Sequence, residues 1–470
     1  MDNHLPLFSL EPQNERAQEV VLSERNKYLV HKDPDGTLVL GIGHVLSKSE
    51  SRATLATLGR HERSDIVVES TAAAEHQCSF EFNWETNFIL FFDRSRAETS
   101  QVYGPECHPF LPHRDRKVVV HPGLNEFISF GGHNRDFIQF RLRWYQDRAG
   151  ALERARYLRH VSLAGDTQLV VDSDSESISP RVSPFRDIEP GQQQIRWHKL
   201  GDLGSGAFGH VYEAVNTDDG TVMAIKTMKQ PEDPQAREKW KKRWLREAKI
   251  LSGVRHLHIV EYIGSQCWDG EVMEIFMALK EGTLQSLVMG GGVRISRDEL
   301  GDIVLNHILQ AIDFLATNFI VHLDIKPDNI LYSMLGDRYL FQLGDFGACH
   351  HEAAELVPLM GAKVYMAPDL PGGRLTHKAD VWSLYVTMLW LSGNAQFRSL
   401  CAGPRKSLKR ISEIISECTL NEEPFLGRIR EMAEVNPNER ASAAQMLVKC
   451  YGGVGLSTPR HRIPPLSGQP

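Results

Sequence analysis

This chain of 470 residues has few cysteines, no long apolar run and no excess of positive charge. Its seven cysteines are an odd number, scattered from Cys78 to Cys450 without a Cys-x-x-Cys pair. This pattern argues against a disulfide framework and a zinc site, and it fits a reducing compartment. No run approaches the ~18 apolar residues that a membrane-spanning helix needs. The net charge of −7 gives no support to a basic, nucleic-acid-binding face.

The amino terminus also lacks the basic segment and apolar core of a secretory signal. Hydrophobic residues make up 41% of the chain and charged residues 24%, which is ordinary for a globular protein. We therefore expect an intracellular protein, in the cytoplasm or the nucleus, with no membrane span and no nucleic-acid partner. Its length favours more than one domain.

Short apolar or alternating runs rich in Val, Ile and Phe fill the chain between about Lys27 and Trp144. They are YLVH, TLVLGIG, DIVVES, CSFEF, FILFF, KVVVH, EFISF and FIQFRLRW, separated by clusters of Gly, Pro, Asp and Asn. Many short strands divided by turn residues are typical of a β-sandwich or barrel. A short helical pattern begins at Ala151.

The composition changes between Asp172 and Gln194, where Ser, Pro and Gln replace large apolar residues and predict a solvated linker. Beyond Arg196, strand-like runs give way to long helical patterns, which favours an α+β domain. The final residues are too rich in Pro and Gly to fold alone. The chain is thus expected to be multidomain: a disordered amino terminus at 1–24, a β-sandwich at 25–148, a linker at 149–195, an α+β domain at 196–452 and a disordered tail at 453–470.

A glycine-rich stretch opens the second domain. LGSGAFGHV, residues 203–211, places Gly204, Gly206 and Gly209 where the backbone can offer N–H groups to phosphate oxygens at close range. Dinucleotide-binding folds carry a similar pattern, but a helix must follow it there, whereas strand, turn and strand follow here. The stretch therefore favours a phosphate site in a β-hairpin.

Lys226 ends the second strand of that hairpin. Taken alone, a lysine on a strand is most often a surface residue whose aliphatic stem packs on apolar neighbours. After a glycine-rich hairpin, its cation is placed to neutralise nucleotide phosphates. Glu247, in the helical pattern that follows, is well placed to hold this lysine, although by itself it would be read as a surface acid.

Acidic and amide side chains recur in two later loops. VHLDIKPDNILY brings Asp324, Lys326 and Asn329 together, and FQLGDFGACH adds Asp345. Phosphoryl transfer needs a carboxylate to accept the hydroxyl proton, a cation beside the moving phosphoryl group, and oxygen ligands for Mg²⁺. Each acid singly would be taken for a capping or surface carboxylate, but their common order favours the catalytic interpretation.

Together these motifs resemble the eukaryotic protein kinases from about Arg196 to Tyr451. The resemblance implies a bilobal α+β fold, ATP and Mg²⁺ as cofactors, and a non-specific serine/threonine protein kinase that acts on protein substrates. It implies catalytic roles for Asp324, Lys326, Lys226 and Glu247, metal ligation by Asn329 and Asp345, and support of the catalytic loop by Asp380. The ATP-binding residues that it implies are Gly204, Ser205, Gly206, Ala207, Phe208, Gly209, Val211, Ala224, Lys226, Met277 as gatekeeper, and Ala278 and Leu279 at the hinge.

Four positions depart from that family's pattern. Leu323 replaces an arginine that often binds a phosphate on the activation segment, and Ala362 replaces a threonine of the catalytic network. Asp369 stands in place of a glutamate, with Arg440 as its expected partner, and Tyr385 in place of a small residue. A lost positioning contact can cost about 10²-fold in rate, which makes Ala362 the change that threatens catalysis most.

The activation segment itself, residues 348–366, contains no serine or threonine. Phosphate control of such a segment needs both a phosphorylatable residue and an arginine to pair with it. Because both are missing, we predict an active kinase whose segment is not switched by Ser/Thr phosphorylation. The alternative is a pseudokinase scaffold that binds nucleotide and partners without turnover.

The first domain resembles the forkhead-associated (FHA) family from about Tyr28 to Trp144, on Leu58-Gly59-Arg60, Asp65-Ile66-Val67 and Glu75-His76. The resemblance implies a β-sandwich that binds phosphothreonine peptides, with Arg60 as a possible phosphate ligand. The family's phosphate-binding serine is Ala73 here, so we expect a degenerate module that serves as a docking or autoregulatory surface for a protein or phosphoprotein partner. A further alternative is that the whole chain is mainly a phosphopeptide-binding module. Ser179 and Ser183 are Ser-Pro sites that we interpret as plain linker.

Overall fold

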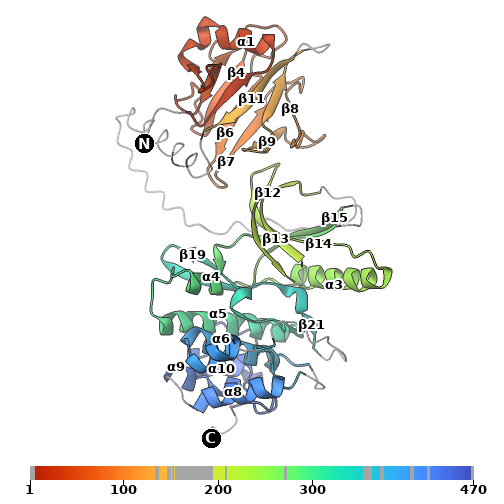
Figure 1. Cartoon of the computed structure of the whole chain (residues 1–470), viewed down its shortest axis with the longest axis vertical. Coiled ribbons are helices and arrows are strands. Elements are labelled where there is room, and N and C mark those ends of the chain that lie inside the picture. Colours follow the sequence, from red (N-terminus) through yellow and green to blue (C-terminus); the bar gives the residue numbers. More distant parts are fainter. Residues whose placement is uncertain are drawn as a thin grey trace. The chain divides into compact units, whose positions relative to one another are not determined.

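The computed structural model describes residues 6–132, 137–145, 150, 153, 194–206, 209–268, 272–352, 363–370, 375–402, 407–420 and 424–466. The chain forms two compact units (Figure 1). The first consists of Met1–Ser183, Gln193–Asp202 and Tyr212–Met223, and the second of Pro184–Gln192, Leu203–Val211 and Ala224–Pro470. The predicted linker at 149–195 lies outside the described residues except at 150, 153, 194 and 195.

Two sheets form the amino-terminal part of the first unit, with strand orders β2-β3-β1-β11-β10-β8 and β5-β4-β6-β7-β9. Neighbouring strands run antiparallel, apart from β4 and β5, which are parallel. The strands are β1 (Phe8–Pro12), β2 (Val30–Lys32), β3 (Leu38–Ile42), β4 (Thr54–Gly59), β5 (Ile66–Val67), β6 (Cys78–Asn83), β7 (Phe88–Asp93), β8 (Gln101–Tyr103), β9 (Lys117–Val120), β10 (Phe127–Phe130) and β11 (Ile138–Trp144).

The two sheets share one hydrophobic core. The rings of Phe8 on β1 and Phe80 on β6 are 5.1 Å apart, and both side chains are fully buried. Along β11, Ile138, Phe140 and Leu142 point inward while Arg141 is exposed, as the alternating pattern of a half-buried strand requires. The arrangement is compatible with the predicted β-sandwich, and every predicted run overlaps a strand.

The prediction of a disordered amino terminus is wrong for residues 6–24. β1 pairs with both β3 and β11, so its backbone hydrogen bonds are satisfied inside the sheet. It is followed by α1 (Glu15–Leu22), which Asn14 caps by accepting the N–H of Ala17, and by a 3₁₀ turn at Glu24–Leu29. A single five-residue strand carries too little alternation to be distinguished from loop by sequence.

A second, smaller core within the first unit joins β7 and β9 to the chain segments at 193–202 and 212–223. Phe88, Leu90, Val119, Leu124 and Val215 form it, and none is more than 5% exposed. The N–H of Val119 donates to the carbonyl of Thr217 (2.9 Å), and Asp218 is ion-paired with both Arg114 and Arg196. Within the first unit, strands β7 and β9 thus have an apolar, hydrogen-bonded contact with these two chain segments.

The remaining sheets and helices follow residue 196. A five-stranded sheet has the order β12-β13-β14-β16-β15, and β17-β19-β20 and β18-β21 form smaller sheets. The strands are β12 (Trp197–Gly206), β13 (Gly209–Asn216), β14 (Val222–Lys229), β15 (Tyr262–Trp268), β16 (Val272–Ala278), β17 (Gly282–Thr283), β18 (Ile320–Val321), β19 (Ile330–Leu335), β20 (Arg338–Leu343) and β21 (His350–His351). The helices are α3 (Pro234–Gly253), α4 (Leu284–Met289), α5 (Arg297–Thr317), α6 (Lys378–Ser392), α7 (Ala395–Ala402), α8 (Leu408–Leu420), α9 (Pro424–Gly427) and α10 (Ala443–Tyr451).

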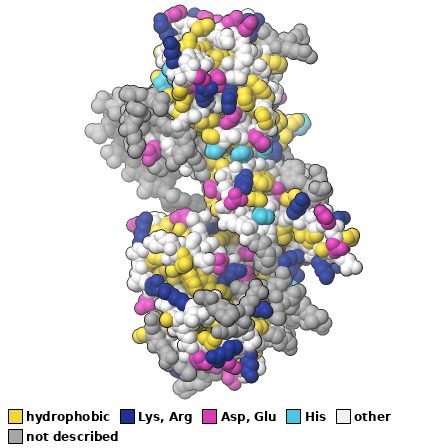
Figure 2. Space-filling view, in the orientation of Figure 1, with side chains coloured by type: hydrophobic (Ala, Val, Ile, Leu, Met, Phe, Trp, Pro, Cys, Tyr) yellow, Lys and Arg dark blue, Asp and Glu magenta, His cyan; other side chains and the backbone are white. Residues whose placement is uncertain are grey.

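Helix α6 lies at the centre of the second unit's core. All of its residues from Ala379 to Leu389 are buried, and α5 packs against it. A helix that is apolar all round is expected in such a central position. No helix among the described residues is long and apolar enough to cross a membrane. On the visible face, charged side chains of both signs are interspersed (Figure 2).

The prediction of a disordered tail is wrong for residues 453–466. These residues follow α10, form a 3₁₀ turn at Arg460–Arg462, and make hydrogen bonds to Asp313 of α5 and Gln445 of α10. The segment does not fold alone, as its composition indicates, but it is held by polar side chains of helices that already exist. The rest of the predicted domain division stays a prediction.

Candidate active site

Lys226 lies between two carboxylates. It is on β14, only 4% exposed, and its Nζ donates to Glu247 Oε1 (2.6 Å) and to Asp345 Oδ1 (2.7 Å). Glu247 lies on the inward face of α3, and Asp345 precedes the 3₁₀ turn at Phe346–Ala348. Residues from a strand, a helix and a loop therefore meet at one ammonium group.

Lys226 and Asp345 stabilise each other's charged forms, whereas burial raises the pKa of Glu247. Burial alone disfavours the ammonium ion, but the two carboxylates outweigh it and raise the pKa of Lys226. Burial likewise disfavours the Asp345 carboxylate, and the neighbouring lysine outweighs it and lowers the pKa of that group. Lys226 and Asp345 thus stay ionised near neutral pH.

Asp324 sits in a second polar cluster. Its Oδ2 accepts from Lys326 Nζ (2.7 Å) and from Asn329 Nδ2 (2.8 Å), and Asn329 also donates to the carbonyl of Asp324 (2.7 Å). The carboxylate is 4% exposed. Among the described residues, its Oδ1 accepts no hydrogen bond. The loop thus fixes one carboxylate oxygen and leaves the other available.

Asp380 of α6 binds the backbone of the loop that contains Asp324. Its buried carboxylate accepts the N–H groups of His322 (2.7 Å) and Leu323 (2.8 Å). Leu323 has φ +68°, a left-handed conformation that costs a non-glycine residue of order 1–3 kcal/mol and persists only where neighbours enforce it. Burial raises the pKa of Asp380 to about 7, although both N–H donors oppose the rise.

The His322 side chain links the two loops. Its Nε2 is 3.0 Å from the carbonyl of Gly344, so that nitrogen donates, and Nδ1 accepts the N–H of Asp324 (3.3 Å). The ring is 0% exposed, and burial lowers its pKa to about 4. It therefore acts as a neutral strut between the Asp324 and Asp345 loops.

The described residues of the glycine-rich stretch lie at the end of β12 and the start of β13. Gly209 has φ +119°, and a Cβ there would lie 2.2 Å from the carbonyl oxygen of Thr227, so only glycine fits. Gly204 and Ser205 are exposed on β12. Val211 follows on β13, Ala224 is on β14, and Met277 and Ala278 end the neighbouring strand β16, with Leu279 directly after it. Ala207 and Phe208 lie outside the described residues.

The family departures have clear structural settings. Leu323 packs its side chain against the large core cluster of the second unit, where an arginine would carry its charge into an apolar contact. Asp369 Oδ1 accepts from Arg440 Nη2 at 2.6 Å, so the expected ion pair is confirmed. Tyr385 is fully buried in α6. Ala362 lies outside the described residues.

Arg243 was missed by the sequence reasoning. Its Nε donates to the carbonyl of Gly347 (3.2 Å), beside Asp345. The signal was present, because Arg243 and Glu247 are four residues apart on α3 and so share a face.

The residues fit a divalent cation. Asp345 Oδ2 and Asn329 Oδ1 accept no hydrogen bond within the described ranges, and both are hard oxygen ligands of the kind that Mg²⁺ prefers. A Cβ on Gly347 would lie 3.1 Å from Lys226 Nζ and 3.2 Å from Asp345 Oδ1, so its absence keeps this site open. No group of three or more His, Cys, Asp or Glu among the described residues could hold a metal alone. This suits Mg²⁺, which usually keeps waters and phosphate oxygens as ligands.

The predicted phosphate ligand of the first unit is less well supported. Arg60 is exposed at the end of β4, and the rings of His61 and His76 stack beside it at 5.3 Å. Ala73 is buried and offers no hydroxyl. Arg94, which directly follows β7, is ion-paired with Glu81 and lies over the Phe92 ring.

A sheet-and-helix domain with a buried lysine–glutamate pair, a glycine turn and two loop carboxylates is the architecture of a protein kinase. A family model described as the protein kinase domain matches residues 197–451, more than half of the chain, and the chain belongs to that family.

The curated proteins to which the chain is similar are also named as protein kinases. Serine/threonine-protein kinase 10 of Homo sapiens is 26% identical over 276 residues, covering 56% of this chain and 27% of that protein. Mitogen-activated protein kinase kinase kinase YODA of Arabidopsis thaliana is 31% identical over 320 residues, covering 63% and 34%. Mitogen-activated protein kinase kinase kinase 3 of the same plant is 29% identical over 270 residues, covering 53% and 41%. The chain thus spans well under half the length of these relatives.

Proposed function

We propose that this chain is an active serine/threonine protein kinase that transfers the γ-phosphate of MgATP to Ser/Thr hydroxyls of protein substrates. The observation that carries the proposal is the intact pair of polar clusters, Lys226 with Glu247 and Asp345, and Asp324 with Lys326 and Asn329. The name of one curated relative, serine/threonine-protein kinase 10, supports the Ser/Thr assignment.

Each side chain has a role that its contacts support. Lys226, held by Glu247, binds the α/β-phosphates. Asp324 Oδ1 accepts the proton of the substrate hydroxyl, since Oδ2 is engaged by Lys326 and Asn329. Lys326 contacts the γ-phosphate. Mg²⁺ supplies neutralisation of phosphate charge when bound, and Asp345 with Asn329 would hold it.

The activation segment works without a phosphate on serine or threonine. Leu323 is committed to the apolar core, so the usual phosphate receiver is absent. The remaining hydroxyl of residues 348–366 is Tyr365, and burial raises the pKa of that phenol. A phosphate found on this segment together with a matching gain in activity would contradict the proposal.

The first unit contains a forkhead-associated-like module that serves as a docking or regulatory surface rather than a strong phosphothreonine reader. The loss of a hydroxyl at Ala73 and the pairing of Arg94 with Glu81 leave Arg60 as the main candidate ligand. Each lost charge-assisted hydrogen bond costs about 1.5–3 kcal/mol of affinity. A phosphothreonine-peptide array would test this, and strong binding that Arg60→Ala abolishes would restore the reader function.

The kinase proposal is tested by incubating purified chain with MgATP and a mixture of Ser/Thr peptides. Wild type should transfer phosphate, and Asp345→Asn should lose at least about 10²-fold, because a metal-binding carboxylate is removed. Asp337→Asn, an exposed acid in the β19–β20 turn, is the matched control. Equal phosphate transfer by wild type and Asp345→Asn would contradict the proposal that the chain is an active kinase. Thermal stabilisation by MgATP without transfer would favour the pseudokinase scaffold.

A further inference from the structure

The tail after α10 folds back as a strap, residues 452–466. Gly452, Gly453 and Gly455 all have positive φ, which lets the chain reverse direction within a few residues. Leu456 and Leu466 then pack on the core of the second unit. Most residues of the strap are exposed or half-buried, and among the described residues it pairs with no strand, so polar side chains supply much of its attachment.

One carboxylate provides the central attachment. Asp313 of α5 is 1% exposed, and its Oδ2 accepts the N–H groups of Ser457 (2.8 Å) and Thr458 (2.9 Å). Its Oδ1 accepts the hydroxyl of Thr458 at 2.6 Å. Within the part of the chain that the structure describes, no cation forms an ion pair with Asp313. All the hydrogen bonds that its carboxylate accepts among the described residues come from the strap.

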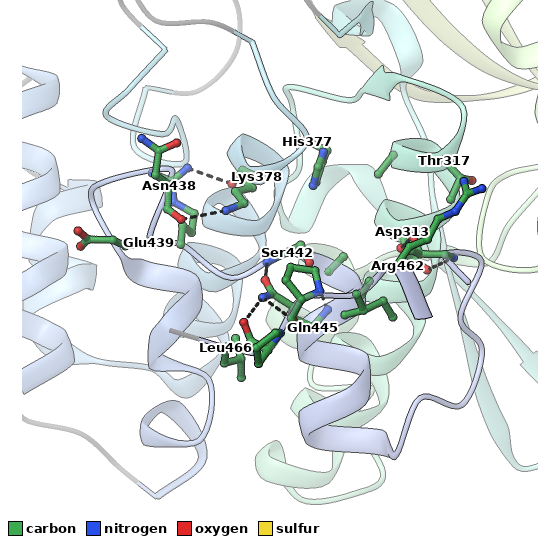
Figure 3. A pocket seen from close by; sticks show the side chains of 18 residues that line it. Asp313, Thr317, His377, Lys378, Asn438, Glu439, Ser442, Gln445, Arg462 and Leu466 are labelled. Carbon is green, nitrogen blue, oxygen red and sulfur yellow. Dashed lines mark hydrogen bonds between the residues drawn. The ribbon is translucent and has the colours of Figure 1, made fainter. Parts of the chain in front are cut away.

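The far end of the strap is tied separately. Gln445 Nε2 donates to the carbonyls of Pro464 (3.0 Å) and Pro465 (3.1 Å). Between the two attachments lies a pocket of about 470 Å³, with Asp313 and Arg462 at one end and Gln445 and Leu466 further along (Figure 3). Its wall includes Arg440, the residue that pairs with Asp369.

We propose that Thr458 is a phosphorylation site for a proline-directed Ser/Thr kinase, and that its phosphate releases the strap from Asp313. Pro459 follows directly and Arg460 next, and the acceptor lies on a half-exposed surface segment. In the reaction, the Thr458 Oγ1–phosphorus bond forms as the bond from the γ-phosphorus to ADP breaks. The ADP oxygen keeps the electron pair, and the hydroxyl proton passes to a base of the modifying kinase. MgATP is the co-reactant.

The contact with Asp313 makes this modification a switch. In the closed strap the Thr458 hydroxyl faces a carboxylate 2.6 Å away, so a modifying kinase can reach it only when the strap opens locally. Once attached, a phosphate of about −1.5 to −2 charge cannot return beside a buried carboxylate. The modification therefore traps the open strap and removes the strap residues from the pocket that Arg440 also lines.

The test uses the full chain in the Asp345→Asn background, so that its own activity does not contribute, with Ser179 and Ser183 replaced by Ala to remove the other Ser-Pro sites. After treatment with a proline-directed kinase and MgATP, mass spectrometry should place one phosphate on Thr458. Hydrogen exchange at the Ser457 and Thr458 amides should then rise by about tenfold or more, since each loses a bond to a charged acceptor.

Three variants sharpen the result. Thr458→Val should take no phosphate and keep its strap protected after treatment, and the neighbouring Ser457→Ala should behave as wild type. Asp313→Asn keeps an acceptor oxygen but removes the charge, so its phosphorylated strap should open less. The proposal is overturned if the folded chain stays unmodified while a peptide of residues 452–466 is modified. It is also overturned if phosphorylation leaves exchange unchanged, or if Asp313→Asn opens as far as wild type.

Discussion

Replacing Asp380 with asparagine should lower the activity of this kinase domain strongly while lowering its free energy of unfolding only a little. The carboxylate accepts the N–H groups of His322 and Leu323 at 2.7 and 2.8 Å, and these bonds enforce the left-handed backbone at Leu323. An asparagine presents one oxygen to one N–H, and its NH₂ group faces the other. One buried donor is therefore orphaned, which costs about 1–3 kcal/mol.

The loss stays this small because the buried charge is itself costly. Burial raises the pKa of Asp380 from 3.8 to about 7, a shift worth about 4 kcal/mol against the charged form. A raised carboxyl pKa means that its contribution to stability is present at low pH and is lost as pH rises towards 7. Relative to Asp380→Asn, wild type should therefore lose stability between about pH 4 and pH 7.

Activity should fall much further. When one of the two hydrogen bonds is lost, the strained conformation of Leu323 is no longer enforced. Asp324 follows Leu323 directly and would be displaced with it, so we expect the rate of phosphate transfer to fall by about 10²-fold. Urea unfolding and initial rates with MgATP measure the two effects, and Asp328→Asn, an exposed acid in the same loop, is the control. Activity within about twofold of wild type would refute the positioning role, and a stability loss well above about 4 kcal/mol would refute the burial argument.

Three further changes have distinct signatures. His322→Gln should remove a loss of stability in acid, because the buried imidazole of wild type must stay neutral and so costs on the order of 3 kcal/mol of unfolding free energy as pH falls from 6.5 to about 4. If urea unfolding gives wild type and variant the same dependence of unfolding free energy on pH, this prediction is wrong. Gly209→Ala should weaken MgATP binding in a thermal-shift titration far more than Gly204→Ala. A Cβ at residue 209 would lie 2.2 Å from the Thr227 carbonyl oxygen, whereas a Cβ at residue 204 would meet nothing within 4 Å. Similar losses of affinity in the two variants would show that steric fit is not the cause. Removing residues 1–148 should expose Val215, which is 0% exposed in the whole chain. We expect a lower melting temperature, or aggregation measured by light scattering. A monomeric truncated chain of unchanged stability would argue against the small core that Val215 forms with Phe88 and Val119.

The sequence anticipated the parts of the site that rest on local chemistry. The glycine-rich stretch, the loops that contain Asp324 and Asp345, and the alternating strands each carry their signal within a few residues, so the pattern alone indicated Gly209, Asp324 and Asp345. The pairing of Asp369 with Arg440 was anticipated from the family pattern and has the expected contact. The roles of these residues stay predictions until activity is measured.

The misses share a physical cause. β1 is stabilised by pairing with strands far along the chain, and the tail by Asp313 and Gln445, so neither shows a local preference for order. The small core around Val215 was also invisible, because its members belong to strands that the pattern assigns to different domains. Composition describes what a segment does alone, and these segments are ordered by what they contact.

The segment after Gly347 contains a thiol with an uncommon property. Cys349 is 0% exposed, and burial raises its pKa well above the ordinary range, so it is neither accessible nor ionised while the segment is closed. Cys401, by contrast, is exposed. An alkylating reagent should therefore modify the exposed Cys401 readily, and Cys349 only when the residues around it open. The rate of covalent labelling at Cys349 would then report how often the chain next to the Asp345 loop opens.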